Sequence, residues 1–271
     1  MLNEHRHMVD TNRLSVLMAA VLLSYALARL IDVERSAITL QIFGIALPIP
    51  LNLTVITTFI TTGLTAAGMD WLLRGHPYYQ SRVSYQHWIL PAATSLVLGV
   101  ILYNLPAGTA WWTSFSIGGI ILFFVFLAEY IALDETDLRY PAASAGLMTL
   151  SFVLFLILTA TLAFVNARLL LIFLVVFPAS AMLVLRNIHL RSGGWEFSWA
   201  GGIALTIVQI AAGLHYWPIS PTQYGLALLG ILYAMTGLAL NLQESVSHRR
   251  AWIEATLGLA IFWTAAFFLK V

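Results

Sequence analysis

Four acidic residues lie close together in a chain that is otherwise mostly apolar: Glu129, Asp134, Glu135 and Asp137. They make up a third of the 12 acids in the protein. Carboxylates at such spacing can hold a divalent cation, exchange protons or contact a basic partner. The run DETD at 134–137 has no second aspartate-rich segment to match it, as a magnesium-dependent prenyl enzyme would require. A solvated link between two buried helices is the simplest interpretation of the last three acids.

Other ionisable side chains are predicted to gather at the same membrane face as these acids. Asp70 and Arg74 are one helical turn apart, which is the spacing of an ion pair on one helix face. Arg250 and Glu254 share this spacing. The candidate polar cluster comprises Asp70, Arg74, His87, Glu129, Asp134, Asp137, Arg250 and Glu254.

Glu129 and Glu254 are the members of this cluster that fall inside predicted membrane spans. A charged side chain within a span is costly, and it usually faces a partner or a water-filled cavity. By depth in the membrane, the nearest partners are Arg74, His87 and Arg250. A structural role is the simplest interpretation of the cluster. The functional alternative is a cytoplasm-facing cavity that binds a lipid headgroup, a proton or a divalent cation.

The chain lacks the motifs of the common catalytic and cofactor sites. It has no cysteine, which excludes disulfides, thiolate nucleophiles and thiolate-bound metals. It has no helical histidine pair at zinc-binding spacing, no Gly-x-Ser-x-Gly and no glycine-rich phosphate loop. A net charge of +1 provides no basic field for nucleic acid. We therefore predict no metal and no cofactor, we identify no catalytic residue and we favour a protein that is not an enzyme, and no motif here is specific enough to identify a family.

The composition indicates an all-α integral membrane protein. Hydrophobic residues make up 60% of the chain and charged residues 9%, whereas soluble domains have about 45–50% and about 25%. A spanning helix needs about 20 apolar residues. Short links separate the candidate spans, so we expect one polytopic transmembrane domain over residues 1–271. The nine predicted spans are 14–31, 51–73, 87–104, 110–132, 141–164, 167–187, 197–215, 222–242 and 251–269.

The segment at 36–50 differs from the rest, and we expect it to form a short non-helical flap. Its sequence, SAITLQIFGIALPIP, alternates apolar and polar residues and then contains two prolines that disfavour helix. Unpaired backbone cannot lie in hydrocarbon, so the flap must lie at the headgroup level or against other helices. Its candidate contact residues are Ile42, Phe43 and Leu47.

The basic residues predict the orientation in the membrane. With nine spans and a cytoplasmic N-terminus, cytoplasmic segments hold nine of the 13 Lys and Arg residues, in agreement with the positive-inside rule. The C-terminus then lies outside. Trp111, Trp112, Tyr216 and Trp217 fall in outer segments and fit an aromatic belt. We expect the protein to lie in a cell or cytoplasmic membrane, such as the bacterial inner membrane.

Three hypotheses for function follow. The leading hypothesis is a non-catalytic scaffold, assembly factor or accessory subunit that binds membrane lipids or another membrane protein. The second is a small transporter that is proton-coupled through Glu129 or Glu254. A short repeat between 112–120 and 195–203 is compatible with the inverted repeats of transporters. The third is a lipid-modifying enzyme that uses the cytoplasmic polar cluster.

Overall fold

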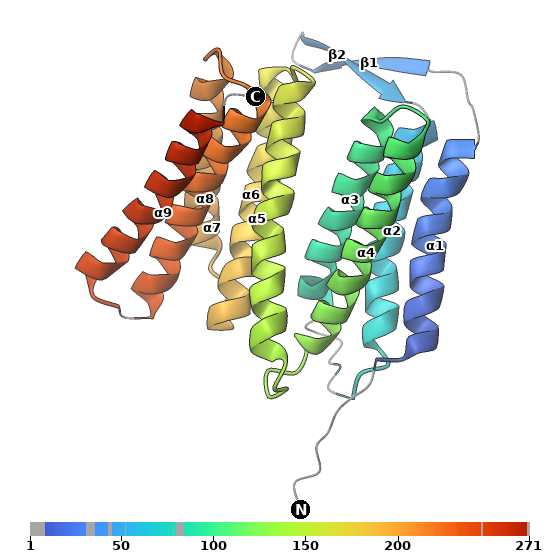
Figure 1. The fold of residues 1–271 in the computed structure, drawn as a ribbon, viewed down its shortest axis with the longest axis horizontal. Helices are drawn as coiled ribbons and strands as arrows, with labels where there is room; N and C mark the ends of the chain where they lie inside the picture. Colours follow the sequence, from blue (N-terminus) through green and yellow to red (C-terminus); the bar gives the residue numbers. More distant parts are fainter. Residues whose placement is uncertain are drawn as a thin grey trace, which may run out of the picture. The chain divides into compact units, whose positions relative to one another are not determined.

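The computed structural model describes residues 9–30, 36–42, 45–51, 53–77, 79, 84–244 and 246–269. Within these residues the chain forms nine α-helices, one short 3-10 helix and one two-stranded hairpin (Figure 1). The elements are α1 Thr11–Leu30, β1 Ser36–Ile42, β2 Ile45–Leu51, α2 Leu53–Leu73, η1 Ser84–Trp88, α3 Ile89–Asn104, α4 Thr109–Ile131, α5 Tyr140–Phe164, α6 Leu169–Ser192, α7 Phe197–His215, α8 Pro221–Gln243 and α9 His248–Phe268. Each helix coincides with one predicted span to within a few residues.

The helical membrane bundle expected from the sequence is confirmed. Eight of the helices in the described part of the chain are long and apolar enough to cross a membrane. The helix α2 is not among them, because it contains six threonines and Asp70. Its 21 residues nevertheless extend about 31 Å, and its exposed Phe59 and Ile60 are apolar. We infer that α2, which packs between α1 and α3, is the ninth span.

The threonines of α2 are accommodated by hydrogen bonds along the helix. Thr62 Oγ1 donates to the carbonyl of Thr58 at 2.8 Å, and Thr65 Oγ1 donates to the carbonyl of Thr61 at 2.7 Å. Such bonds to the preceding turn satisfy a hydroxyl without any other partner. A threonine-rich helix can therefore remain within an apolar bundle.

The chain divides into two compact units, residues 1–143 and 144–271, and each is described separately. The expectation of one transmembrane domain over 1–271 stays a prediction. In the first unit, α2 packs against α1 and α3, and α4 packs against α3 and α1. The buried core between these helices includes Val21, Leu72, Leu122 and Phe126. Gly99 of α3 lies directly against the Thr58 side chain of α2, so these two helices approach closely.

The segment between α1 and α2 is an antiparallel hairpin of β1 and β2, in which Ile42 lies opposite Ile45. The non-helical flap expected at 36–50 is thus confirmed. Of its predicted contact residues, Ile42 and Leu47 lie in the two strands. Their side chains, and the whole of Phe43, lie outside the described residues.

Two prolines in β2 make the two edges of the hairpin different. Pro48 lies opposite Thr39, and Pro50 lies opposite Ala37. A proline has no N–H, so neither pair can be one that exchanges two backbone hydrogen bonds. The backbone groups of these four residues must therefore face the free edges. The edge of β2 lacks two donors, whereas the edge of β1 retains them.

The second unit contains α5 from Ser144 onward and α6 to α9, with α8 packed against α6, α7 and α9. Its buried core includes Phe155, Val176, Ile203 and Leu228. The helix α8 begins with a capping box, in which Ser220 and Gln223 satisfy each other's backbone N–H groups. Each of the two buried apolar clusters named above lies within a single unit.

The sixth helix continues beyond its predicted end. The prediction placed the end at residue 187, but α6 extends to Ser192. Gly193 ends the helix in the left-handed conformation, with a φ of 70°, and its N–H donates to the carbonyl of His189. Glycine adopts this conformation without steric cost. Pro178 lies inside the same helix.

Candidate functional site

The first unit contains a fully buried pair of ionisable side chains, His87 and Glu129. His87 Nδ1 lies 2.7 Å from Glu129 Oε2. The side chains are 2% and 0% exposed. In a membrane bundle, such groups are expensive to bury and usually mark a functional position. We therefore take this pair as the centre of the candidate site.

The position of Glu129 follows from the helical period of α4. Leu122, Phe126 and Glu129 occur at spacings of four and three residues, and all three are fully buried. These spacings place side chains on one face of a helix. The carboxylate thus continues an apolar stripe that points into the first unit, rather than facing the link that follows.

His87 reaches this carboxylate from η1, the short 3-10 helix at the start of α3. The turn Ser84–Trp88 leads directly into α3, which begins at Ile89. Pro91 lies in the first turn of α3, where its missing N–H costs little. The turn therefore continues into α3, and Gln86–Asn104 together form one candidate membrane span, with His87 buried at its start.

Gln86 contacts the other nitrogen of the imidazole. Its Nε2 lies 3.1 Å from His87 Nε2. In this arrangement the imidazole accepts a hydrogen bond at Nε2 and donates one from Nδ1 to Glu129. Among the described residues, Gln86 Oε1 has no hydrogen-bond partner although it is buried. Rotating the amide would place Oε1 against Nε2, and the imidazole would then donate from both nitrogens.

These two arrangements differ by one proton. A doubly protonated imidazole beside a carboxylate makes a neutral pair. A singly protonated imidazole beside the same carboxylate leaves one net negative charge in the interior. Rotation of the Gln86 amide therefore lets the imidazole keep both hydrogen bonds in either protonation state.

Asp70 and Arg74 form a separate polar group beside an open groove. Arg74 Nη2 lies 2.7 Å from Asp70 Oδ2, and the Tyr79 hydroxyl donates to Asp70 Oδ1 at 2.8 Å. The hydrogen bond to Asp70, together with the charge of that carboxylate, raises the pKa of Arg74. The groove is lined by Asp70, Arg74 and the indole of Trp88. Neither His87 nor Glu129 lines this groove.

Asp134 and Asp137 form hydrogen bonds within their own turn and not with Glu129. Asp134 Oδ1 accepts hydrogen bonds from the backbone N–H and hydroxyl of Thr136, at 2.9 and 2.6 Å. Asp137 accepts from the backbone N–H of Arg139 at 2.8 Å and also from its guanidinium. This hydrogen bond to Asp137 raises the pKa of Arg139. These contacts are typical of a solvated link.

Arg250 and Glu254 belong to the second unit. Arg250 Nε donates to Glu254 Oε1 at 2.8 Å, and Asn241 Nδ2 donates to Glu254 Oε2 at 2.9 Å. The Glu254 side chain is 45% exposed. Nearby, Arg191 pairs with Glu244 at 2.6 Å. The eight predicted residues therefore form two local ion pairs and one buried pair, whereas Asp134 and Asp137 interact within the link. Their role as one cluster stays a prediction.

The sequence pointed to His87 and Glu129 but missed Gln86, whose position beside a candidate histidine was the available signal. It also missed a buried polar group in the second unit. Arg186 and Asn187 are 1% and 0% exposed, and the Ser151 hydroxyl donates to Asn187 Oδ1 at 2.9 Å. The prediction ended the sixth helix at residue 187, so Arg186 and Asn187 were interpreted as part of a helix end and not as buried groups. The glycine pair at 193–194 was the signal for a longer helix.

Metal ligands do not gather in the part of the chain that the structure describes. No three histidine or acidic side chains there are close enough to share an ion. The arrangement at His87 and Glu129 is instead suited to holding and moving a proton.

Comparison with known proteins gives one match. Residues 33–269 match the model of a family described as "Protein of unknown function (DUF5656)". No curated protein and no solved structure matches the chain.

Proposed function

Because the chain belongs to this family of unknown function, no activity follows from membership, and we propose one from the geometry. The protein is an integral membrane protein that binds and releases a proton at His87 and Glu129. Its function is that of a small proton-coupled carrier. The observation that carries the proposal is the complete burial of this hydrogen-bonded pair within a membrane bundle.

The energetics of burial connect proton binding to conformation. A net charge in an apolar interior is costly, whereas a protonated imidazole beside a carboxylate is neutral. Loss of the proton therefore favours a conformation in which water reaches the pair. Binding of the proton favours the closed conformation. A ligand that prefers one conformation would be linked to the proton in this way.

Other ionisable groups lie at the same end of the first unit as the buried pair. They come from the neighbouring elements. Asp10 precedes α1 and Arg13 lies in its first turn, Asp70 lies in the last turn of α2, and Tyr130 lies at the end of α4. Arg74, His76 and Tyr79 follow α2. The groove lined by Asp70, Arg74 and Trp88 is an open surface in this unit, and we propose that the proton enters through it. In the proposed orientation, with the N-terminus inside and nine spans, this surface faces the cytoplasm.

Infrared difference spectroscopy on the complete protein in lipid vesicles tests proton binding. The comparison is made between about pH 5 and pH 8, where histidine ordinarily titrates. We expect carboxyl and imidazole bands that change with pH in the wild type and are lost in Glu129→Gln and His87→Gln. Glu254→Gln is the matched control, since Glu254 is also a helical glutamate with a cationic partner, and it should keep the bands. If Glu129→Gln keeps them too, the pair does not exchange a proton and the proposal fails.

Proton flux tests the carrier function directly. Vesicles that enclose a pH-sensitive dye are given an imposed membrane potential. We expect the wild type to admit protons and Glu129→Gln to lose most of this flux. If Glu129→Gln and the wild type are equally impermeable to protons while the infrared bands of the wild type change with pH, the pair senses pH without carrying protons.

A second candidate function is that of an accessory or assembly component, and the hairpin favours it. Its β1 edge retains outward-facing donors, so it can pair with an extended segment of another membrane protein. Thr39→Pro blocks this edge without removing a hydrogen bond from the hairpin, because Thr39 lies opposite Pro48. Leu40→Pro removes a donor that the hairpin uses and serves as the disruptive comparison.

Cross-linking in native membranes tests this second function. We expect Thr39→Pro to lose the cross-linked partner, and Ile42→Asp or Leu47→Asp to lose it if the apolar flap also contributes. Unchanged cross-linking in all three variants would exclude the hairpin as the docking surface.

A further inference from the structure

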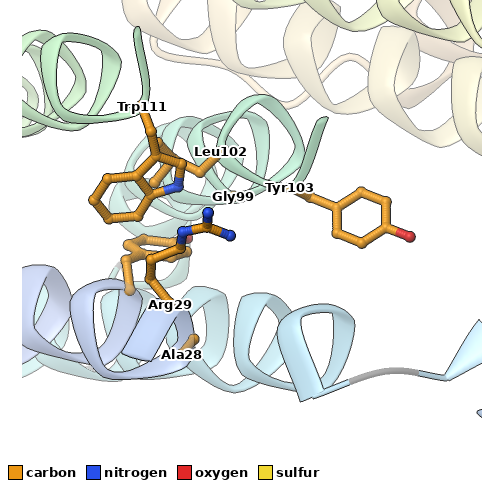
Figure 2. A pocket seen from close by; sticks show the side chains of 7 residues that line it. Ala28, Arg29, Gly99, Leu102, Tyr103 and Trp111 are labelled. Carbon is orange, nitrogen blue, oxygen red and sulfur yellow. The ribbon is translucent and has the colours of Figure 1, made fainter. Parts of the chain in front are cut away.

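A small cavity lies in the first unit, at the opposite end of α3 and α4 from the buried pair. Its volume is about 50 Å³. The lining comes from the last residues of α1, the last residues of α3 and the first turn of α4, and includes Arg29, Leu102 and Trp111 (Figure 2). Three helices thus contribute to one site, which the proposed function does not use.

The polar groups that face this cavity are hydrogen-bond donors. Figure 2 shows the Arg29 guanidinium and the nitrogen-bearing edge of the Trp111 indole at the cavity, whereas the Tyr103 ring turns away from it. Across the residues that the structure describes, neither the guanidinium nor the indole N–H has a hydrogen-bond or ion-pair partner. The remaining hydroxyl, that of Tyr25, already donates to the carbonyl of Ser95 at 2.6 Å.

Trp111 is held rigidly in place. Its side chain is 3% exposed. Its ring stacks on Phe115 with centroids 5.2 Å apart and meets Trp112 edge-on at 4.8 Å. A donor fixed in this way loses little conformational entropy when it binds a ligand. The cavity is therefore a preformed site for a group with several acceptor oxygens and a negative charge.

The depth of the cavity indicates where that group comes from. Trp111 precedes Glu129 by 18 residues on α4, which corresponds to about 27 Å along the helix axis. The hydrocarbon core of a bilayer is about 30 Å thick, so the cavity lies at the headgroup level when the buried pair lies near the other face. Leu30 and Trp112, beside the two donors in sequence, are strongly exposed and apolar. Apolar surface therefore extends from the cavity toward acyl chains.

We propose that this cavity binds the phosphate of an anionic phospholipid headgroup. The guanidinium of Arg29 and the indole N–H of Trp111 donate to the phosphate oxygens. Inorganic phosphate has the same acceptor chemistry, but it lacks the acyl chains that the neighbouring apolar surface would hold.

Lipid retention by the complete, delipidated protein in detergent tests the proposal. Phosphatidylglycerol, diacylglycerol and inorganic phosphate are added separately, and bound ligand is counted by native mass spectrometry. We expect wild-type protein to retain phosphatidylglycerol in preference to diacylglycerol. Arg29→Gln should weaken this binding by about tenfold or more, because a charge-assisted hydrogen bond is lost. Trp111→Phe keeps the ring packing, removes the N–H and should weaken binding by a smaller factor.

Arg139→Gln is the control, because it removes the same charge from the first unit at an arginine already paired with Asp137. It should leave retention unchanged. Equal losses in Arg29→Gln and Arg139→Gln would overturn the site, since only net charge would then matter. Undiminished binding by Arg29→Gln would overturn it as well. Binding of inorganic phosphate as tight as that of phosphatidylglycerol would overturn the lipid assignment.

Thermal unfolding without added lipid separates binding from folding. We expect Arg29→Gln and wild-type protein to unfold at the same temperature when no phospholipid is present, and to differ once phosphatidylglycerol is added. A lower unfolding temperature for Arg29→Gln without lipid would show that Arg29 serves the fold, for example through Asp32 or Glu34 just after it in the sequence. That result would overturn the proposal.

Discussion

The two units each contain a glutamate near a helix end with a basic partner, yet the two glutamates are in opposite environments. Glu129 of the first unit is fully buried against His87. Glu254 of the second unit is 45% exposed beside Arg250. In α4 the glutamate continues the stripe of Leu122 and Phe126. In α9 the buried stripe consists of Ala251, Ala255 and Gly258, and Glu254 lies at its margin. The position on the helix face, more than the depth in the chain, decides which acid is removed from water.

This difference determines what each pair can do. An exposed ion pair contributes little to stability, because water and salt screen both charges. A buried pair is balanced between a large desolvation cost and a strong interaction, so removing one partner leaves an expensive group behind. Removing one partner is therefore expected to cost far more in the first pair than in the second.

The largest effect is expected from Glu129→Ala. It leaves His87 buried without its carboxylate, and we expect it to lower the free energy of unfolding by about 3 kcal/mol or more. Equilibrium unfolding in mixed micelles measures the change. Glu254→Ala is the matched control and should be close to neutral. Similar losses in the two variants would show that the contrast between the units is wrong.

The next effect is a recovery of stability. The double variant His87→Leu with Glu129→Leu replaces the buried pair with apolar side chains, and we expect it to be at least about 1 kcal/mol more stable than Glu129→Ala. It should also lose the pH-dependent infrared bands. If the double variant is less stable than Glu129→Ala, the pair is required for packing and the desolvation argument does not hold.

A smaller effect is expected at the interface that supports His87. Gly99→Ala places a methyl group against Thr58 and should reduce stability by about 1–2 kcal/mol. Gly63→Ala is the control, because a Cβ at Gly63 meets no atom within 4 Å. Both changes add the same methyl group to a helix, so a difference between their unfolding curves isolates helix contact. Equal curves would mean that α2 and α3 can separate without cost.

The smallest effect is expected from Arg74→Gln. This variant tests whether the pH dependence of stability is set by the burial of an ion pair or by its membership of the first unit. A pKa raised in the folded state contributes stability that is lost only as pH rises through that value, and for arginine this is far above neutral. The stability profile between about pH 5 and pH 8 should therefore keep its shape in this variant. A changed profile would mean that Asp70 and Arg74 are coupled to the buried pair.

The helices were predicted well from the sequence, because in lipid the length and apolar composition of a segment largely determine whether it forms a helix. An apolar run such as 141–164 has few alternatives to a helix, and α5 occupies Tyr140–Phe164. The flap was also predictable, because Pro48 and Pro50 exclude a helix at that point. The end of α6 was missed because Arg186 resembles a helix end, whereas the determining residue is Gly193 further on.

The candidate site was predicted less completely. Glu129 was identified because a charge within a span is unusual, and His87 because it lies at the same depth. No local rule distinguishes Glu129 from Glu254 until the buried stripe of each helix is known. The role of Gln86 depends on its 3.1 Å contact with the imidazole, which is a tertiary contact. The cavity at Arg29 also depends on three helices that are separate in sequence.

Pro178 has a mechanical consequence for the second unit. Without an N–H, it deprives the carbonyl of Leu174 of its helical donor, and it opens one side of α6 within the span. The Ser180 hydroxyl donates to the carbonyls of Val176 and Phe177, at 2.7 and 3.0 Å, and such bonds to the preceding turn favour bending of a helix. Both features lie within one turn, so bending of α6 is expected to concentrate about halfway along the helix.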